Sequence, residues 1–469
     1  METITARMAQ WAAVLRYEDL PAAVVHQAKR YLLDSLGCAL GGLRQEDAEI
    51  ALAVLREIGG SGPCAVLGTG RRTDAVSASL ANALLIRVMD YNDIYWQQDP
   101  SHPSDIIPAA LAGAELMDAG GRELIVGIVL GHEFEMRLCE AAIPGIRERG
   151  WHHATLTAFV SPIVMGRMLR LPWPQIQHAI GISGSRQCTL GAVTAGKLTM
   201  MKNTVDPLAT QSGVLAALLA RRGYTGPEHV IDGKEGLVRV FGPEWRLEVL
   251  TDGLGSDWRI LRCGMKAYPT EALTHTPISA VLELVQEHDL SPDDVASVTI
   301  RSLARAADIL ADPSKYDPRS KETADHSLPY CVAAAIVDRQ VTPAQFQPQR
   351  IMDPVIRAQL SKVRVIADPG IEAVFPALQR THVTIETTSG TQLTRQLDYP
   401  RGNPHHPLTD TQVAEKFAAL AEPVLSERAR AELTRAIWSL DGLARVHELG
   451  ELCAADRAGQ PALAGAQAQ

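Results

Sequence analysis

The chain has 469 residues, of which 46% are hydrophobic, 21% charged and only 5% aromatic, so it can bury more than one core and favours helix over sheet. Acidic residues outnumber basic ones by 54 to 45, and no Lys/Arg-rich run occurs, which argues against nucleic-acid binding. No apolar run reaches the roughly 18 residues of a membrane span. Seven scattered cysteines without CxxC spacing predict free thiols and a cytoplasmic protein.

Apolar residues recur at helical spacing through the first 262 residues, and no convincing strand interrupts them. Several of these segments lack a polar face, which is typical of buried helices. We predict helices over residues 20–36 (ended by Gly37), 45–58, 74–89, 108–117, 122–139, 154–169, 174–182 and 207–222.

The pattern changes from Cys263 onward, where period-2 alternation predicts strands over residues 295–302, 362–367, 383–387 and 392–397, with helices between them. Helices return from about residue 409, and a tail over 461–469 is expected to be disordered. The predicted fold class is mainly α. A large all-helical domain formed by both chain ends (1–262 and 402–460) would carry an inserted smaller α+β lid domain, 263–401.

Polar side chains that could carry chemistry gather in one loop, residues 90–105, between two predicted helices. Asp90, Asp93 and His102 lie there, and loops on rigid scaffolds often hold functional groups. A structural interpretation is equally open at this point, in which the loop is a well-anchored turn with a core-facing histidine.

Further candidates stand near other predicted helix ends: His152, Lys202, Lys266, Glu271, Ser327 and Tyr330. Lysines could neutralise a substrate with several carboxylates and stabilise the charge that forms when a neighbouring C–H proton leaves. An imidazole or carboxylate would be the base, and a histidine or tyrosine the acid. No HxxxH or HExxH spacing supports a metal site.

The chain resembles the MmgE/PrpD family over about residues 5 to 450. The matching motifs follow one another in order: Leu33-Asp34-Ser35-Leu36-Gly37, Asp90-Tyr91-Asn92-Asp93, His102-Pro103-Ser104-Asp105, Gly150-Trp151-His152-His153, Lys202, Gly223-Tyr224-Thr225-Gly226-Pro227, Lys266-Ala267-Tyr268-Pro269, Glu322-Thr323-Ala324-Asp325-His326-Ser327-Leu328-Pro329-Tyr330, Asn403-Pro404 and Pro407-Leu408-Thr409.

The resemblance implies a homodimer without metal or organic cofactor, acting on a small polycarboxylate between its two domains. It implies catalytic roles for His102, His152, Asp90 and Tyr330. Substrate contacts would come from the following positions: Lys202, Lys266, Asp93, Ile94, Glu271 and Ser327.

The resemblance leaves the reaction open, because Ile94 stands where family members commonly have Thr, and Leu273 where a dehydratase often has His. We expect a hydro-lyase that dehydrates a citrate-like hydroxytricarboxylate, in the first place 2-methylcitrate to 2-methylaconitate. The alternatives are an epimerase or a decarboxylase acting on iminodisuccinate- or aconitate-like acids, and a non-catalytic helical dimer.

Overall fold

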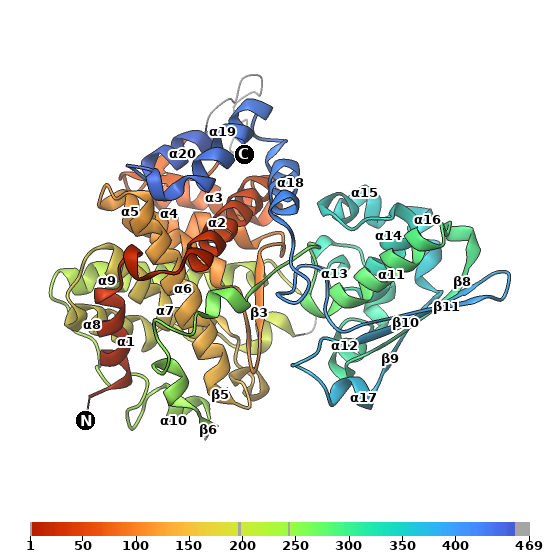
Figure 1. Cartoon of the computed structure of the whole chain (residues 1–469), viewed down its shortest axis with the longest axis horizontal. Coiled ribbons are helices and arrows are strands. Elements are labelled where there is room, and N and C mark those ends of the chain that lie inside the picture. The colour runs from red at the N-terminus through yellow and green to blue at the C-terminus, as the bar shows by residue number, and fades with distance from the viewer. Residues whose placement is uncertain (1, 196–197, 243, 455–469) are drawn as a thin grey trace.

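Two large clusters of buried apolar side chains organise the chain in the computed structural model, which describes residues 2–195, 198–242 and 244–454. One cluster is built by helices from both ends of the chain, here called the helical body. The other is built by the elements between residues 272 and 397, here called the α+β unit, together with Trp96 and Tyr268. Figure 1 shows the two as adjacent lobes, with α18, α19 and α20 lying over the helical body.

The helical body contains ten helices before the α+β unit and three after it, counted over the described residues. They are α1 (Ile4–Val14), α2 (Ala22–Gly42), α3 (Glu46–Ile58), α4 (Ala75–Arg87), α5 (Ile107–Leu116), α6 (Gly121–Ala141), α7 (Ala154–Met168), α8 (Trp173–Gly184), α9 (Met201–Arg221), α10 (Leu237–Phe241), α18 (Asp410–Ala421), α19 (Glu427–Trp438) and α20 (His447–Ala454).

The α+β unit is a four-stranded sheet with helices packed against it. Its strand order is β11 (Gln392–Leu397), β10 (Thr381–Thr387), β8 (Val295–Ser302) and β9 (Val363–Ala367), and only the β8–β9 pair is parallel. The helices are α11 (His275–Glu287), α12 (Ala304–Ile309), α13 (Lys321–Ala324), α14 (Leu328–Asp338), α15 (Pro348–Ile351), α16 (Pro354–Leu360) and α17 (Pro369–Glu372).

The mainly α fold is thus confirmed, but the expectation of an all-helical larger domain is wrong in detail. Short antiparallel pairs join its loops: β1 (Cys64–Val66) with β2 (Arg71–Thr73), β3 (Asp93–Trp96) with both β4 (Pro100–Ser101) and β7 (Gly264–Met265), and β5 (Ala142–Ile143) with β6 (Glu244–Trp245). Strands of two to four residues leave almost no alternation pattern in a sequence. The motion implied by the word lid stays a prediction.

Gly37 does not end a helix, as the sequence had predicted, but lies inside α2. A Cβ atom at this position would lie 3.1 Å from the Cα atom of Phe417, so the glycine allows α2 and α18 to approach closely. The two chain ends therefore pack directly on each other.

All seven cysteines carry free thiols, as predicted. Within the described ranges, the helices lack the combination of length and apolar character that a membrane crossing needs. The predicted disordered tail, 461–469, lies outside the described residues.

Candidate active site

The loop after α4 turns sharply at Asp90, whose φ of 52° is in the left-handed region. Few residues other than glycine adopt this conformation, and such positions gather at functional sites. Beyond the turn, β3 pairs with β7, so that Asp93 lies opposite Met265. This pairing carries Lys266, the next residue, back to the Asp90 turn.

Three cationic side chains meet the carboxylate of Asp90. Lys202 Nζ, near the start of α9, donates to Oδ2 at 2.8 Å, and Lys266 Nζ donates to Oδ1 at 2.6 Å. The guanidinium of Arg87 also donates to Oδ1. All four side chains are buried. The structure therefore brings Asp90, Lys202 and Lys266 together, as the sequence analysis required.

The two lysines differ in how many of their N–H donors are left without a partner. Lys266 Nζ also donates to the carbonyl oxygens of Asp90, at 3.2 Å, and Thr270, at 2.9 Å, so its three N–H groups are used. In the part of the chain that the structure describes, Lys202 Nζ has Asp90 as its one hydrogen-bond partner. Lys202 therefore keeps donors for an external anion, whereas Lys266 holds Asp90 in place.

Burial and charge oppose each other in this cluster. Burial alone would raise the pKa of Asp90, but Lys202, Lys266 and Arg87 hold it well below its ordinary value. Burial lowers the pKa of Lys202 to about 8, although Asp90 acts in the other direction. Burial likewise lowers the pKa of Lys266. The site thus contains a lysine that changes its charge in the mildly alkaline range.

His102 is held as one tautomer. Its Nδ1 lies 2.6 Å from the carbonyl oxygen of Asp93, and since a carbonyl only accepts, Nδ1 carries the proton. Burial, followed by the charges of Arg87 and Lys266, lowers the pKa of His102 well below its usual value, so the ring is neutral. Its Nε2 therefore presents a lone pair.

His152 is held as the opposite tautomer. Its Nδ1 accepts from the backbone N–H of Ala154 at 3.2 Å, so the proton of the neutral ring is on Nε2. Burial and then His153 lower the pKa of His152 well below its usual value. The ring of His153 packs against both, with its centroid 3.9 Å from that of His152 and 5.5 Å from that of His102.

Further buried carboxyl groups support these side chains. Asp93 accepts from the backbone N–H and the hydroxyl of Ser104, at 2.9 and 2.6 Å, which fixes the strand beside His102. Asp206, on α9, lies 3.4 Å from Nε2 of His153 and 3.9 Å from Nε of Arg87. Asp93 thus acts in the hydrogen bonding of the loop, and its predicted substrate contact stays a prediction.

Lys416, on α18, supports the site from behind. It pairs with Asp34 of α2 at 2.7 Å and donates to the carbonyl oxygens of Tyr91, at 2.6 Å, and Lys266, at 3.0 Å. These two residues adjoin or belong to the Asp90 cluster. The C-terminal helices therefore fix the backbone on which the charged groups stand.

Tyr330 shares no contact with these groups among the described residues. Its hydroxyl donates to the carbonyl oxygen of Gln345 at 2.5 Å, and its ring is fully buried in the core of the α+β unit. Ser327 caps α14, where its hydroxyl accepts from the backbone N–H of Tyr330 at 3.0 Å. Both side chains thus make local structural contacts, and their predicted roles in the site stay predictions.

Glu271 and Ile94 also have local structural roles. The Glu271 carboxylate accepts from the backbone N–H of Leu273, at 2.6 Å, at the start of a short helical turn. Ile94 is half-buried in β3 and lies opposite Gly264 of β7. Their predicted substrate contacts stay predictions.

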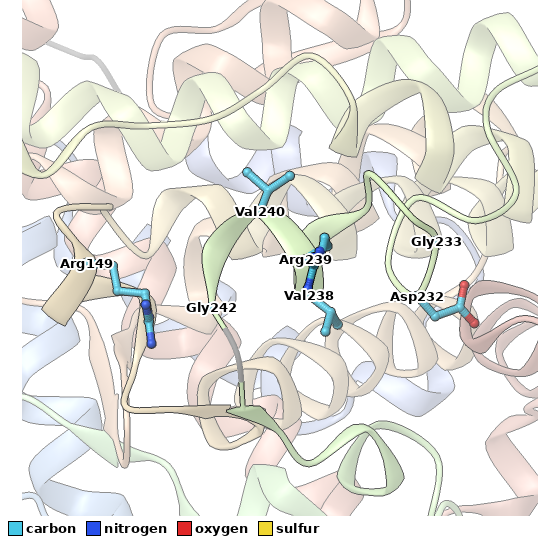
Figure 2. A pocket seen from close by; sticks show the side chains of 7 residues that line it. All are labelled: Arg149, Asp232, Gly233, Val238, Arg239, Val240 and Gly242. Carbon is cyan, nitrogen blue, oxygen red and sulfur yellow. The ribbon is translucent and has the colours of Figure 1, made fainter.

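A pocket of about 440 Å³ lies apart from these groups, around α10. Figure 2 shows its lining, which contains none of the predicted site residues: Arg149, Asp232, Gly233, Val238, Arg239, Val240 and Gly242.

Comparison with known protein families shows which family the chain belongs to. The family description "MmgE/PrpD N-terminal domain" matches residues 6–249, and "MmgE/PrpD C-terminal domain" matches residues 268–441. The chain belongs to the MmgE/PrpD family.

Individual MmgE/PrpD relatives match nearly the whole chain. A cis-aconitate decarboxylase from Aspergillus terreus is 26% identical over 474 residues, which cover 96% of this chain and 95% of the relative. A 2-methylcitrate dehydratase from Cupriavidus necator is 26% identical, with 90% and 88% covered. A human cis-aconitate decarboxylase is 25% identical, with 94% and 93% covered. The comparisons support an enzyme of the lyase type found in the MmgE/PrpD family.

Among the residues that the structure describes, two buried groups have the geometry to hold a metal ion: Asp93 with His132 and Cys263, and His152 with His153 and Asp206. Neither fits a cation well. Both oxygens of Asp93 already accept hydrogen bonds from Ser104, and the Arg87 guanidinium lies beside Asp206. The expectation of a metal-free site remains a prediction.

Several residues of the candidate site had escaped the sequence analysis. Arg87, Asp206 and Lys416 lie within predicted or near-predicted helices, where charged residues usually face solvent. His153 was quoted only as the neighbour of His152. The one available signal was that Arg87 and Asp206 stand among almost uncharged residues.

Proposed function

We propose that this chain is a cofactor-independent hydro-lyase that dehydrates a citrate-like hydroxytricarboxylate, in the first place 2-methylcitrate. The observation that carries the proposal is the pair of opposite tautomers, with a lone pair on Nε2 of His102 and a proton on Nε2 of His152. Dehydration needs one group that accepts a proton and another that gives one. A decarboxylation needs only the second.

The charges at the Asp90 turn suit an anionic substrate. Arg87, Lys202 and Lys266 all contact the one carboxylate of Asp90. Asp105 and Asp206 also lie near Arg87, at 3.5 and 3.9 Å, but burial raises the pKa of Asp105 well above its ordinary value, so positive charge remains for a substrate carboxylate. Lys202, which has unused donors, would bind that carboxylate and stabilise the negative charge that builds up during proton removal.

The reaction then proceeds by two proton transfers, one to His102 and one from His152. Nε2 of His102 takes the proton from the carbon next to the bound carboxylate, and the C–H electron pair moves toward that carboxylate. As the C=C bond forms, the C–O bond breaks, and the proton on Nε2 of His152 joins the departing hydroxide to give water. This leaves His152 as an imidazolate, and transfer of the proton gained by His102 to His152 restores both neutral rings. Asp90 stabilises the protonated His102 that results, because its charge raises the pKa of this ring.

A second candidate, decarboxylation of a cis-aconitate-like acid, is favoured by the relatives with that name in Aspergillus terreus and Homo sapiens. The substrate would lose carbon dioxide, and His152 would protonate the carbon left behind. An epimerase would use the same first step as the dehydratase and return a proton to the opposite face.

The deciding experiment incubates the protein with a panel of di- and tricarboxylates in deuterated water and follows the products by proton NMR. Dehydration, epimerisation and decarboxylation give different spectra. We expect water loss from 2-methylcitrate. Turnover of cis-aconitate with release of carbon dioxide, and none of 2-methylcitrate, would replace the first candidate with the second.

Variants of the two histidines test the assigned roles. Asparagine can reproduce the Nδ1 hydrogen bond of histidine but has no counterpart of Nε2. His102→Asn should lose both deuterium exchange and dehydration, whereas His152→Asn should keep exchange and lose dehydration. His26→Asn, at a partly exposed histidine on α2, is the matched control. Retained dehydration in both variants would refute the assignment.

We also propose that the protein works as a cytoplasmic homodimer. The family resemblance implies the dimer. In addition, α3 exposes an apolar stripe whose members are spaced four residues apart: Ile50, Val54 and Ile58. Light scattering of the wild type and Val54→Glu tests this: a dimer that becomes a monomer in the variant is expected, and a monomeric wild type would contradict it.

A further inference from the structure

Arg147 is a half-buried arginine beside the candidate site that none of the roles above uses. It belongs to a short helical turn, Ile146–Arg149, which follows β5. The buried carboxylate of Asp99 holds the start of this turn by accepting from the backbone N–H groups of Ile146, at 2.9 Å, and Arg147, at 3.0 Å. The backbone of Arg147 is therefore fixed.

The guanidinium of Arg147 is also oriented, but it is not neutralised. It lies over the ring of Trp96, 5.4 Å from the ring centroid. Across the described ranges, no carboxylate lies within ion-pair distance of it, and its side chain makes no hydrogen bond. The nearby Arg305, in contrast, pairs with Glu148 at 3.1 Å. Arg147 thus presents donors without an acceptor.

The electrostatic surroundings agree with this geometry. Burial, followed by the charge of Arg305, lowers the pKa of Arg147 to about 10, so the group is still charged at neutral pH. A charged group that is partly removed from water is costly unless an anion compensates it. A bound carboxylate would supply that compensation.

The turn that carries Arg147 adjoins the segment of His152, because the backbone N–H of Trp151 donates to the carbonyl oxygen of Ile146 at 3.2 Å. The charge of Arg147 is one of those that lower the pKa of His152, and the carboxylate of Glu271 acts on Arg147 in turn. Trp96, the ring beneath the guanidinium, belongs to the core of the α+β unit and contacts Phe375 there, with ring centroids 5.5 Å apart. An anion on Arg147 would therefore lie near both units.

We propose that Arg147 binds one carboxylate of the substrate through two parallel hydrogen bonds, apart from the carboxylate held by Lys202, and so selects tricarboxylates over dicarboxylates. This rests on the proposed function, because it concerns the same site. Arginine suits the task, since its planar fork matches a carboxylate and its stacking on Trp96 fixes the plane.

Binding of a non-reactive acid tests the inference without turnover. Tricarballylate has three carboxylates but neither hydroxyl group nor double bond, and glutarate has two carboxylates. Calorimetry should show that Arg147→Gln raises the Kd of tricarballylate about 10- to 100-fold, as expected for charge-assisted hydrogen bonds, and that of glutarate less than about 2-fold. Arg147→Lys should fall between, because it keeps the charge but not the fork.

Arg305→Gln is the matched control, because this neighbouring arginine already has a carboxylate partner, and it should leave both affinities unchanged. Equal weakening of both acids in Arg147→Gln, or an unchanged Kd for tricarballylate, would overturn the inference, as would a wild type that does not bind tricarballylate. Selective weakening in a protein that turns over no acid would uphold the inference and reject the proposed function.

Discussion

Lys266 holds Asp90 by two different atoms, the carboxylate oxygen Oδ1 at 2.6 Å and the main-chain carbonyl oxygen at 3.2 Å. The double contact fixes both the side chain and the left-handed backbone of Asp90. Because Lys266 uses Oδ1, the other carboxylate oxygen, Oδ2, is left to accept from Lys202 at 2.8 Å, so one aspartate is the counter-charge for both lysines.

Replacing this aspartate should therefore affect both stability and activity. Asp90→Asn leaves Lys202, Lys266 and Arg87 buried without their shared partner, and breaking a buried ion pair from one side costs about 3–5 kcal/mol. We expect a loss of this size in the free energy of unfolding, measured in urea, and a fall in kcat/KM of at least about a hundredfold. Asp317→Asn, at an exposed ion pair, is the control. An active, stable Asp90→Asn protein would contradict the charge network.

The pKa of Lys202, about 8 against an ordinary 10.5, gives opposite pH trends for activity and stability. Above pH 8 the lysine loses the charge that binds substrate, so kcat/KM should fall. Between about pH 8 and 10.5 the unfolded chain binds more protons than the folded one, so the contribution of Lys202 to stability rises. In Lys202→Arg the alkaline fall in kcat/KM should move to higher pH, and an unchanged profile would exclude Lys202 as its source.

Lys416 should behave as a positioning residue. Lys416→Met removes the hydrogen bonds to the carbonyl oxygens of Tyr91 and Lys266 and leaves Asp34 buried without a partner. We expect a fall in kcat of at least about tenfold. Adding Asp34→Asn to Lys416→Met removes the unpaired negative charge of Asp34. The double variant should therefore regain stability more than it regains kcat.

Lys362→Met is the matched control for this experiment, because Lys362 also donates to two carbonyl oxygens, those of Pro292 and Val295, but within the α+β unit. It should lower stability with kcat little changed. An equal effect of both lysine variants on kcat would mean that Lys416 acts only through global stability.

The protein should work without a metal ion. Activity is expected to survive dialysis against a chelator, and elemental analysis of the active protein should find less than stoichiometric metal. Loss of activity that returns with one added divalent metal would instead assign a function to the group formed by His152, His153 and Asp206.

The sequence predicted local structure well where a repeating pattern exists. The strand expected at residues 295–302 is β8, with the same limits, because its side chains alternate between core and surface. Prediction was poorer where a single residue was misread. The helix expected from Pro207 begins at Met201, since a proline can lie within the early turns of a helix whose other contacts compensate for the missing N–H.

The site was predictable as a set of residues but not as a geometry. Asp90 was singled out in the polar loop, and Lys202 and Lys266 near predicted helix ends, and the three side chains do meet. The position of Tyr330 depends on where the carbonyl group of Gln345 lies, and the support from Lys416 depends on a contact with α2 that spans most of the chain. Local pattern carries no information about such distant partners.

The support from Lys416 has a consequence for how the enzyme comes into being. A nascent chain that has emerged from the ribosome only as far as the α+β unit already contains every proton-transferring group of the site. It still lacks the lysine that fastens Tyr91 and Lys266. Catalytic competence should thus arise abruptly, once synthesis has passed α18, rather than build up gradually as the polypeptide lengthens.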